Sequence, residues 1–213
     1  MLNNPADILS VVLRGALGRS GRKRARRATR FVTGHGGFLT ASTVLAAAGV
    51  AWGIYDSMKG ANVPGGGIAP MGTAPAGATV PPIPVLPADL PDPVLQMIRL
   101  AVSASRADGE LTAQERSLIL ERARAAGLEA VIEPELTQTS RPLSEIVRGA
   151  TDPAARKEFY TLAFTIVRAD ETVTGAERIY LAQLAHQLGL DPAAVSAIEA
   201  ETTAKIDAQP DTE

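Results

Sequence analysis

The 213-residue sequence predicts an all-α protein. Its main part is a bundle of about seven helices in two related halves, preceded by a single transmembrane helix and a Pro/Gly-rich linker. Three observations carry this prediction: one segment is repeated, apolar residues recur with helical spacing, and aromatic residues make up only 4% of the chain. Ala and Leu must therefore fill most of the core, which favours helices over sheets.

The repeat relates residues 106–128 to residues 168–190 at one constant offset, without a gap. Nine of these 23 positions are identical. The shared positions include the Arg-Ala-Asp triplets that begin at Arg106 and Arg168. Two copies of one helical unit predict a single domain assembled from related halves.

Charge divides the chain into a basic part and an acidic part. Residues 1–88 carry nine Lys/Arg and two Asp/Glu, whereas residues 89–213 carry 12 Lys/Arg and 21 Asp/Glu. This asymmetry predicts a basic arm that faces an anionic surface and an acidic domain that faces another partner. The absence of Cys excludes disulfides, zinc–thiolate sites and thiol chemistry.

Residues 1–37 form a basic N-terminal segment. Pro5 and Asp7 precede an apolar run that ends at two glycines, which predicts a short helix within residues 1–18. Seven cations follow, and the apolar stretch beside them makes an anionic membrane their expected partner. They are Arg19, Arg22, Lys23, Arg24, Arg26, Arg27 and Arg30. Nucleic-acid binding is disfavoured because this run has no aromatic residue for base stacking.

Residues 38–59 are the predicted transmembrane helix. No residue from Phe38 to Tyr55 carries a charge. As a helix, this run is about 27 Å long against a hydrocarbon core of roughly 30 Å. Trp52 and Tyr55 suit an interfacial position at the far end. A buried or self-associating Ala/Gly helix is one alternative, and a cleaved signal or transit peptide is another.

The expected location follows from this segment. In a single-pass protein of a bacterial inner membrane, the positive-inside rule places the basic run, and with it the N-terminus, in the cytoplasm. The helical domain would then lie on the far side of the membrane. If residues 38–59 do not cross, the whole protein stays in the cytoplasm.

Residues 60–88 are predicted to be a linker. Residues 61–88 contain seven Pro, five Gly and no charge. This composition favours extended polyproline segments with a flexible joint at residues 65–67. Residues 207–213 are expected to form a disordered tail.

Helix start signals divide residues 89–206 into the predicted helices. Asp-Pro pairs supply an N-cap acid and a first-turn proline at three of these starts. Capping boxes supply two more, in which a Thr hydroxyl and a Glu carboxylate each accept a free backbone N–H. The Asp-Pro pairs begin at Asp92, Asp152 and Asp191, and the capping boxes are Thr112 with Glu115 and Thr174 with Glu177.

Each copy of the repeat also places an Asp and a Glu seven residues apart around a helix start. Acids from two halves that converge would suit a divalent cation such as Ca²⁺, which prefers carboxylate oxygens. The candidate ligands are Asp108, Glu115, Asp170 and Glu177. Their alternative role is structural, because the glutamates fit capping boxes and the aspartates can accept N–H bonds in the turns.

Residues 108–115 match the second half of a calcium-binding EF-hand loop, including its Gly and its final Glu. The first two ligand positions of that loop would be Ala104 and Arg106, and neither supplies a carboxylate. The second copy fails in the same way. The sequence therefore argues against an EF-hand.

The duplicated Ala-Asp-x-x-(Leu/Val)-Thr-x-x-Glu-Arg segments resemble the TerB tellurite-resistance family. The stretch from Glu177 to Pro192 is similar to the membrane-associated, uncharacterised branch of that family. The resemblance covers residues 92–202. It implies a seven-helix fold, a role in tellurite or stress response, and cation binding by Asp108, Glu115, Asp170 and Glu177.

Motifs for catalysis are missing from the sequence. It has no phosphate-binding loop, no nucleophile elbow and no HExxH metal motif, and its two His residues, His35 and His186, have no evident nucleophile partner. We therefore expect no enzyme, and a cation is the only cofactor predicted. The expected function is a membrane-anchored TerB-like module of the envelope stress response, whose helical domain binds a protein partner. The alternative is a scaffolding domain that binds a protein without a metal.

Overall fold

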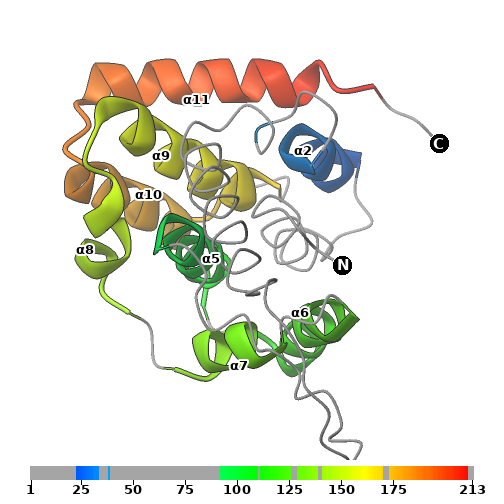
Figure 1. Ribbon diagram of the computed structural model, residues 1–213. Coiled ribbons are helices and arrows are strands. Elements are labelled where there is room, and N and C mark those ends of the chain that lie inside the picture. The colour runs from blue at the N-terminus through cyan, green and yellow to red at the C-terminus, as the bar shows by residue number, and fades with distance from the viewer. Residues whose placement is uncertain are drawn as a thin grey trace, which may run out of the picture.

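The computed structural model describes residues 23–33, 38, 92–109, 111–125, 129–138, 141–169 and 173–210 (Figure 1). These residues form helices and turns, with no strand among them. The helices are α2 (Lys23–Thr33), α5 (Asp92–Ala104), α6 (Ala113–Ala125), α7 (Glu129–Thr137), α8 (Leu143–Ile146), the 3-10 helix η1 (Val147–Gly149), α9 (Pro153–Arg168), α10 (Gly175–Gln187) and α11 (Pro192–Asp207). The predicted all-α class is confirmed, and α5 to α11 are the seven α-helices expected of the helical domain.

Several predictions concern residues outside those that the structure describes. They are the short helix within residues 1–18, the transmembrane helix 38–59 apart from Phe38, the linker 60–88 and the last three residues of the tail. Within the described ranges, no helix combines the length and apolar character needed to cross a membrane.

Helix α9 is the centre of the bundle. Every residue from Phe159 to Val167 is buried, so this helix is covered on all sides. It contacts α2, α5, α10 and α11 (Figure 1). A helix that is apolar around its whole circumference is stable only when other helices surround it, which explains why the bundle is organised around α9.

Two of the predicted Asp-Pro caps are confirmed. The Asp152 and Asp191 carboxylates accept hydrogen bonds from the N–H groups of Ala155 (2.9 Å) and Ala194 (2.8 Å). These caps satisfy N–H groups that would otherwise lack a partner at a helix start. Helix α5 begins at Asp92 itself, and at α6 the Thr112 carbonyl accepts the first regular helical bond, from the Arg116 N–H.

The internal repeat extends to whole helices. The offset that relates Arg106 to Arg168 also carries the bounds of α6, Ala113 and Ala125, onto the bounds of α10, Gly175 and Gln187. It carries α5 into α9, and the first residue of α7, Glu129, onto Asp191, the N-cap residue of α11. The domain therefore consists of two related three-helix units, α5–α6–α7 and α9–α10–α11. The clearest difference is length, because α11 has 16 residues where α7 has nine.

The basic segment contains a helix that the sequence analysis did not predict. In α2, Ala25, Ala28, Phe31 and Val32 are buried, whereas Arg26 is exposed. The helix packs against α9 and α11 (Figure 1). Apolar residues at positions i, i+3, i+6 and i+7 were the missed signal, because they form one helix face.

A hydrogen bond also connects α2 to the C-terminal end of the described chain. The Arg30 guanidinium donates to the carbonyl of Pro210, beyond the end of α11. The residues from Ala208 to Pro210 are thus held beside α2, although they fall within the predicted tail.

Candidate functional site

The four predicted cation ligands do not form a described cluster. Asp108 is exposed in the turn after α5, and Glu177 is buried at the start of α10. The side chain of Glu115 and the whole of Asp170 lie outside the described residues. Among the residues with described side chains, no group of three or more His, Asp or Glu is arranged to hold a metal ion.

Glu177 performs the structural role that was its alternative. Its Oε2 accepts a hydrogen bond from the Thr174 N–H at 2.6 Å, and the Thr174 hydroxyl oxygen accepts one from the Glu177 N–H at 3.2 Å. This is a complete capping box, and the side chain is 5% exposed. One carboxylate oxygen is therefore already used inside the fold.

An arginine at the start of the first repeat holds the end of a helix. Arg106 follows α5, and its Nη2 donates to the carbonyl of Leu136 at 2.6 Å. Its Nη1 donates to the carbonyl of Gln138 at 3.3 Å. Carbonyls in the last turn of a helix have no partner within that helix, so Arg106 satisfies acceptors at the C-terminal end of α7.

A buried carboxylate, that of Glu135, binds two arginines near the same end of α7. Glu135 accepts hydrogen bonds from the Nε of Arg99 (3.0 Å) and the Nε of Arg141 (3.2 Å). Arg141 also donates to Glu145 at 2.9 Å. Glu135 is 9% exposed and the two arginines are 23% and 25% exposed. The network joins α5, α7 and the segment before α8.

Arg168 is the equivalent of Arg106 in the second copy, but its surroundings differ. The repeat offset carries Leu136 onto Ile198 and Gln138 onto Ala200. Both lie inside the longer helix α11, where their carbonyls are used by the helix itself. Consistent with this difference, the Nε of Arg168 is buried and has no hydrogen-bond partner among the described residues.

Arg168 lines a groove of about 1110 Å³ between α10 and α11, with α9 as its floor. The apolar part of the lining includes Phe164, Leu181 and Val195. Arg178 adds a second cation, and Glu199 and Asp207 place acids on the α11 wall. The groove therefore combines an apolar floor with separated charges of both signs.

A hydrogen bond fixes the Tyr160 side chain in this groove. The Tyr160 hydroxyl donates to Glu199 Oε1 at 2.7 Å. Burial raises the pKa of Tyr160 above its ordinary value, and the hydrogen bond to Glu199 adds to the shift. The phenol therefore stays protonated and continues to donate.

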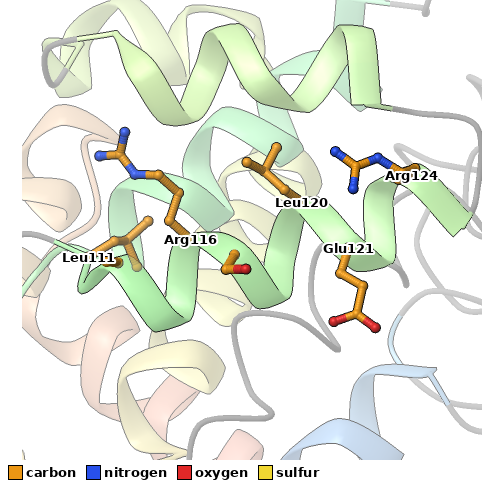
Figure 2. A pocket seen from close by; sticks show the side chains of 7 residues that line it. Leu111, Arg116, Leu120, Glu121 and Arg124 are labelled. Atoms are coloured by element: carbon orange, nitrogen blue, oxygen red, sulfur yellow. The ribbon is translucent and has the colours of Figure 1, made fainter.

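A second, smaller groove of about 770 Å³ lies along α6. Figure 2 shows Arg116, Leu120 and Arg124 on the side of α6 that faces α7, and Glu121 on the opposite side. Three lining residues correspond to lining residues of the α10–α11 groove. The repeat offset carries Leu111, Arg116 and Leu120 onto Val173, Arg178 and Ala182.

Arg124, which lines the groove along α6, is paired with a carboxylate of the protein itself. The Nε of Arg124 donates to both carboxylate oxygens of Glu129, at 3.1 and 3.0 Å. This pair joins α6 to α7 at the surface. Arg124 thus has a carboxylate partner within the protein, whereas the Nε of Arg168 has no hydrogen-bond partner among the described residues.

The groove between α10 and α11 was not predicted from the sequence. Arg168 was recognised only as part of the repeat, and Arg178 was given no role. A usable signal was the unequal length of the third helix in each unit. A longer α11 removes the free carbonyls that the Arg106 interaction needs, which leaves Arg168 without the partner of its counterpart.

The fold defines an all-α protein made from two related three-helix units, with a groove open in the second. The family model described as "Protein of unknown function (DUF533)" matches residues 8–202, so the chain belongs to this family. The match begins in the basic N-terminal segment and ends in α11. Neither the curated proteins nor the solved structures gave a significant match to the chain.

Proposed function

We propose that the protein is a membrane-attached, non-enzymatic helical module that binds a protein partner and resembles TerB proteins of the tellurite and envelope stress response. The observation that carries the proposal is the uncharged run from Phe38 to Tyr55 beside seven cations. Such a pair suits membrane attachment, in which the apolar residues enter the bilayer and the cations contact anionic headgroups. The family match extends from residue 8 to residue 202, which supports treating both ends of the chain as one functional unit.

The contact of α2 with α9 and α11 restricts how the membrane segment can be used. Residues 38–59 lie between α2 and the helical domain in the sequence. A single crossing by residues 38–59 would place α2 on one side of the membrane and α9 and α11 on the other. Helix α2 could then not contact α9 and α11. We infer that, with α2 docked, residues 38–59 enter the bilayer from one side, and that the single-pass arrangement requires α2 to leave the bundle.

The single tryptophan of the chain tests membrane attachment directly. Trp52 is the only Trp and lies within residues 38–59. The full chain, mixed with vesicles that contain anionic lipid, should show a blue shift of Trp emission and quenching by lipids brominated on the acyl chain. Unchanged emission and no quenching would rule out attachment through this segment. A variant with Val44→Arg and Val50→Arg is the matched control, because charge in the apolar run opposes insertion.

A divalent cation is the second part of the proposal, and its support is the duplicated Asp and Glu positions. Ca²⁺ at Asp108 and its repeat equivalent Asp170 would stabilise the fold by mass action, by about 2.7 kcal/mol at a hundredfold excess over the dissociation constant. The melting temperature of the full chain should therefore rise with millimolar Ca²⁺, and Asp108→Asn and Asp170→Asn should abolish the rise. An unchanged melting temperature would remove the cation from the account.

The alternative function is a scaffolding module that binds a protein without a metal. Glu177 favours it, because its carboxylate is held in a capping box. Arg168 and the groove between α10 and α11 favour it as well, since they offer a surface for a partner. The Ca²⁺ experiment separates the alternatives, because a metal-free scaffold melts at the same temperature with and without the ion.

A further inference from the structure

We propose that the groove between α10 and α11 docks an amphipathic segment of a partner protein, and that a carboxylate of this segment pairs with Arg168. The inference deepens the proposed protein-binding role by naming the surface and the chemistry of the partner. It does not depend on membrane attachment.

Arg168 has a hydrogen-bond donor that none of the described residues uses. The equivalent Arg106 donates to two carbonyl oxygens at the end of α7, whereas the Arg168 Nε is buried without a partner among the described residues. A buried N–H group that lacks an acceptor is unfavourable, so an acceptor that reaches the Arg168 Nε–H is stabilising. An ionised carboxylate is the strongest acceptor for this group, since it forms charge-assisted bonds with planar guanidinium geometry.

The shape and composition of the groove favour a protein segment as the occupant. It follows α11 from Val195 to Asp207, which is roughly 18 Å of helix. Phe164, Leu181 and Val195 provide apolar contacts over part of this length. A lone small anion would leave most of that surface uncovered, whereas an amphipathic segment of about three helical turns would cover it.

Charges of both signs are distributed along the groove. Arg168 and Arg178 attract an acid, but Glu199 and Asp207 line the same groove. Such a mixed lining opposes an extended anionic surface, so it disfavours a membrane or a nucleic acid. It suits a peptide that carries an acid near the arginines and a cation near the α11 wall.

The test uses the full chain and a defined probe. The probe is a synthetic peptide of about 12 residues, with leucines at helical i, i+3, i+4 and i+7 spacing, glutamates on one side of them and lysines on the other. In ¹⁵N NMR spectra, the Nε–H resonance of Arg168 should shift on titration and its exchange with water should slow. Arg168→Gln, which lacks this Nε–H, identifies the resonance.

Three comparisons give the expected result. Arg168→Gln should weaken peptide binding at least about tenfold, and Arg178→Gln, at an exposed position, should weaken it less. Arg148→Gln, an exposed arginine in η1 outside the groove lining, should bind like the unmodified protein. The same peptide with Gln in place of each Glu should bind the unmodified protein as weakly as the Glu peptide binds Arg168→Gln.

Several results would overturn the proposal. One is equal binding of the Glu and Gln peptides, and another is an unmoved Arg168 resonance. An equal shift with acetate alone would indicate a small-anion site, and an equal shift with anionic vesicles would indicate a membrane surface. A shift that depends on protein concentration alone would indicate a second copy of this chain. None of these results changes the quenching of Trp52, so failure of this inference and failure of membrane attachment can be distinguished.

Discussion

At the scale of single residues, one side chain illustrates how a helix cap and a metal ligand can be confused. Glu177 was predicted in both roles, because each requires a carboxylate at the start of a helix. The structure places it in a capping box, with an oxygen 2.6 Å from the Thr174 nitrogen. A capping box accepts Gln as well as Glu, whereas a cation site requires the charge of the carboxylate.

The two roles of Glu177 predict different effects of one substitution. We expect Glu177→Gln to retain most of the stability, and Glu177→Ala to lose about 1 kcal/mol, as is typical for loss of a helix cap. Urea unfolding followed by circular dichroism measures both changes. The contrary result is a Glu177→Gln variant that keeps its stability without Ca²⁺ but, with Ca²⁺ present, is destabilised as much as Glu177→Ala. The carboxylate would then be a cation ligand.

Among the charged residues that the structure describes, Glu135 is the one whose removal should destabilise the protein most. Glu135→Ala leaves the half-buried Arg99 and Arg141 without their shared partner. Loss of one partner from a fully buried pair costs about 3–5 kcal/mol, and partial exposure of the arginines reduces this to about 2 kcal/mol. The urea midpoint measures the effect. Arg124→Gln is the matched control, since it breaks an exposed pair with Glu129 and should change the midpoint little. Equal effects of the two substitutions would contradict the role given to burial.

At the scale of helices, the acidic side chain that joins α9 to α11 predicts a pH dependence. Glu201 accepts hydrogen bonds from Lys157 and Lys205, both at 2.7 Å. The bond from Lys157, followed by that from Lys205, lowers the pKa of Glu201 from its ordinary 4.5 to about 2. A carboxylate with a lowered folded pKa stabilises the protein above its unfolded pKa, and this contribution disappears as the pH falls toward 2.

Glu201→Gln should therefore reduce stability slightly at pH 6, and the difference from the unmodified protein should vanish near pH 2. The effect is small because Glu201 is 42% exposed and solvent screens its charge. Unfolding curves of both proteins across this pH range provide the measurement. A constant difference across the range would show that titration of Glu201 is not the cause.

The docking of α2 makes a prediction for hydrogen exchange. Ala28 is fully buried, so Ala28→Glu cannot keep α2 packed against the bundle without burying a charge. We expect amide exchange in residues 25–32 to become fast, while α5 and α9 stay protected. Arg26→Glu, on the exposed face of the same helix, should leave the protection of α2 unchanged. Equal protection of α2 in all three proteins would contradict the contact.

The sequence predicted the helices of the bundle better than it predicted their surroundings. Asp152 and Asp191 cap α9 and α11 as expected, because a cap is decided by residues within one turn of each other. The packing of α2 on α11 was missed, since it depends on residues far apart in the chain. Arg168 was missed for the same reason. The lack of a partner for its Nε among the described residues follows from the length of α11, and the sequence around Arg168 contains no sign of it.

The candidate cation ligands were also predicted from a local pattern. Such a pattern cannot distinguish a helix cap from a cation ligand. The spacing of Asp108 and Glu115 around a helix start is shared by a cap and by a ligand pair. Only the position of one repeat relative to the other decides between them, and periodicity contains no information on that position. Among the described residues, Glu177 takes part in a capping box, and the cation role of all four acids stays a prediction.

At the scale of the whole molecule, α2 connects the two parts that composition separates. The basic part of the chain reaches back to the acidic part, where α2 packs on α9 and α11. The exposed Arg26 remains available to an anionic surface, whereas the apolar face of α2 is used inside the bundle. Membrane attachment with α2 docked therefore depends on the cations of this segment and on residues 38–59.

The side of the membrane on which each part lies tests this account most directly. The chain has no Cys, so Arg26→Cys in α2 and Gln183→Cys in α10 each introduce a unique thiol at an exposed position. Each variant of the full chain would be treated with a membrane-impermeant maleimide in intact bacterial spheroplasts and again after lysis. The account predicts a membrane-bound protein in which both thiols react only after lysis, because α2 and the helical domain share the cytoplasmic side. Reaction of the Gln183→Cys thiol in intact spheroplasts, with the Arg26→Cys thiol protected, would contradict it and establish a single crossing with α2 separated from the bundle.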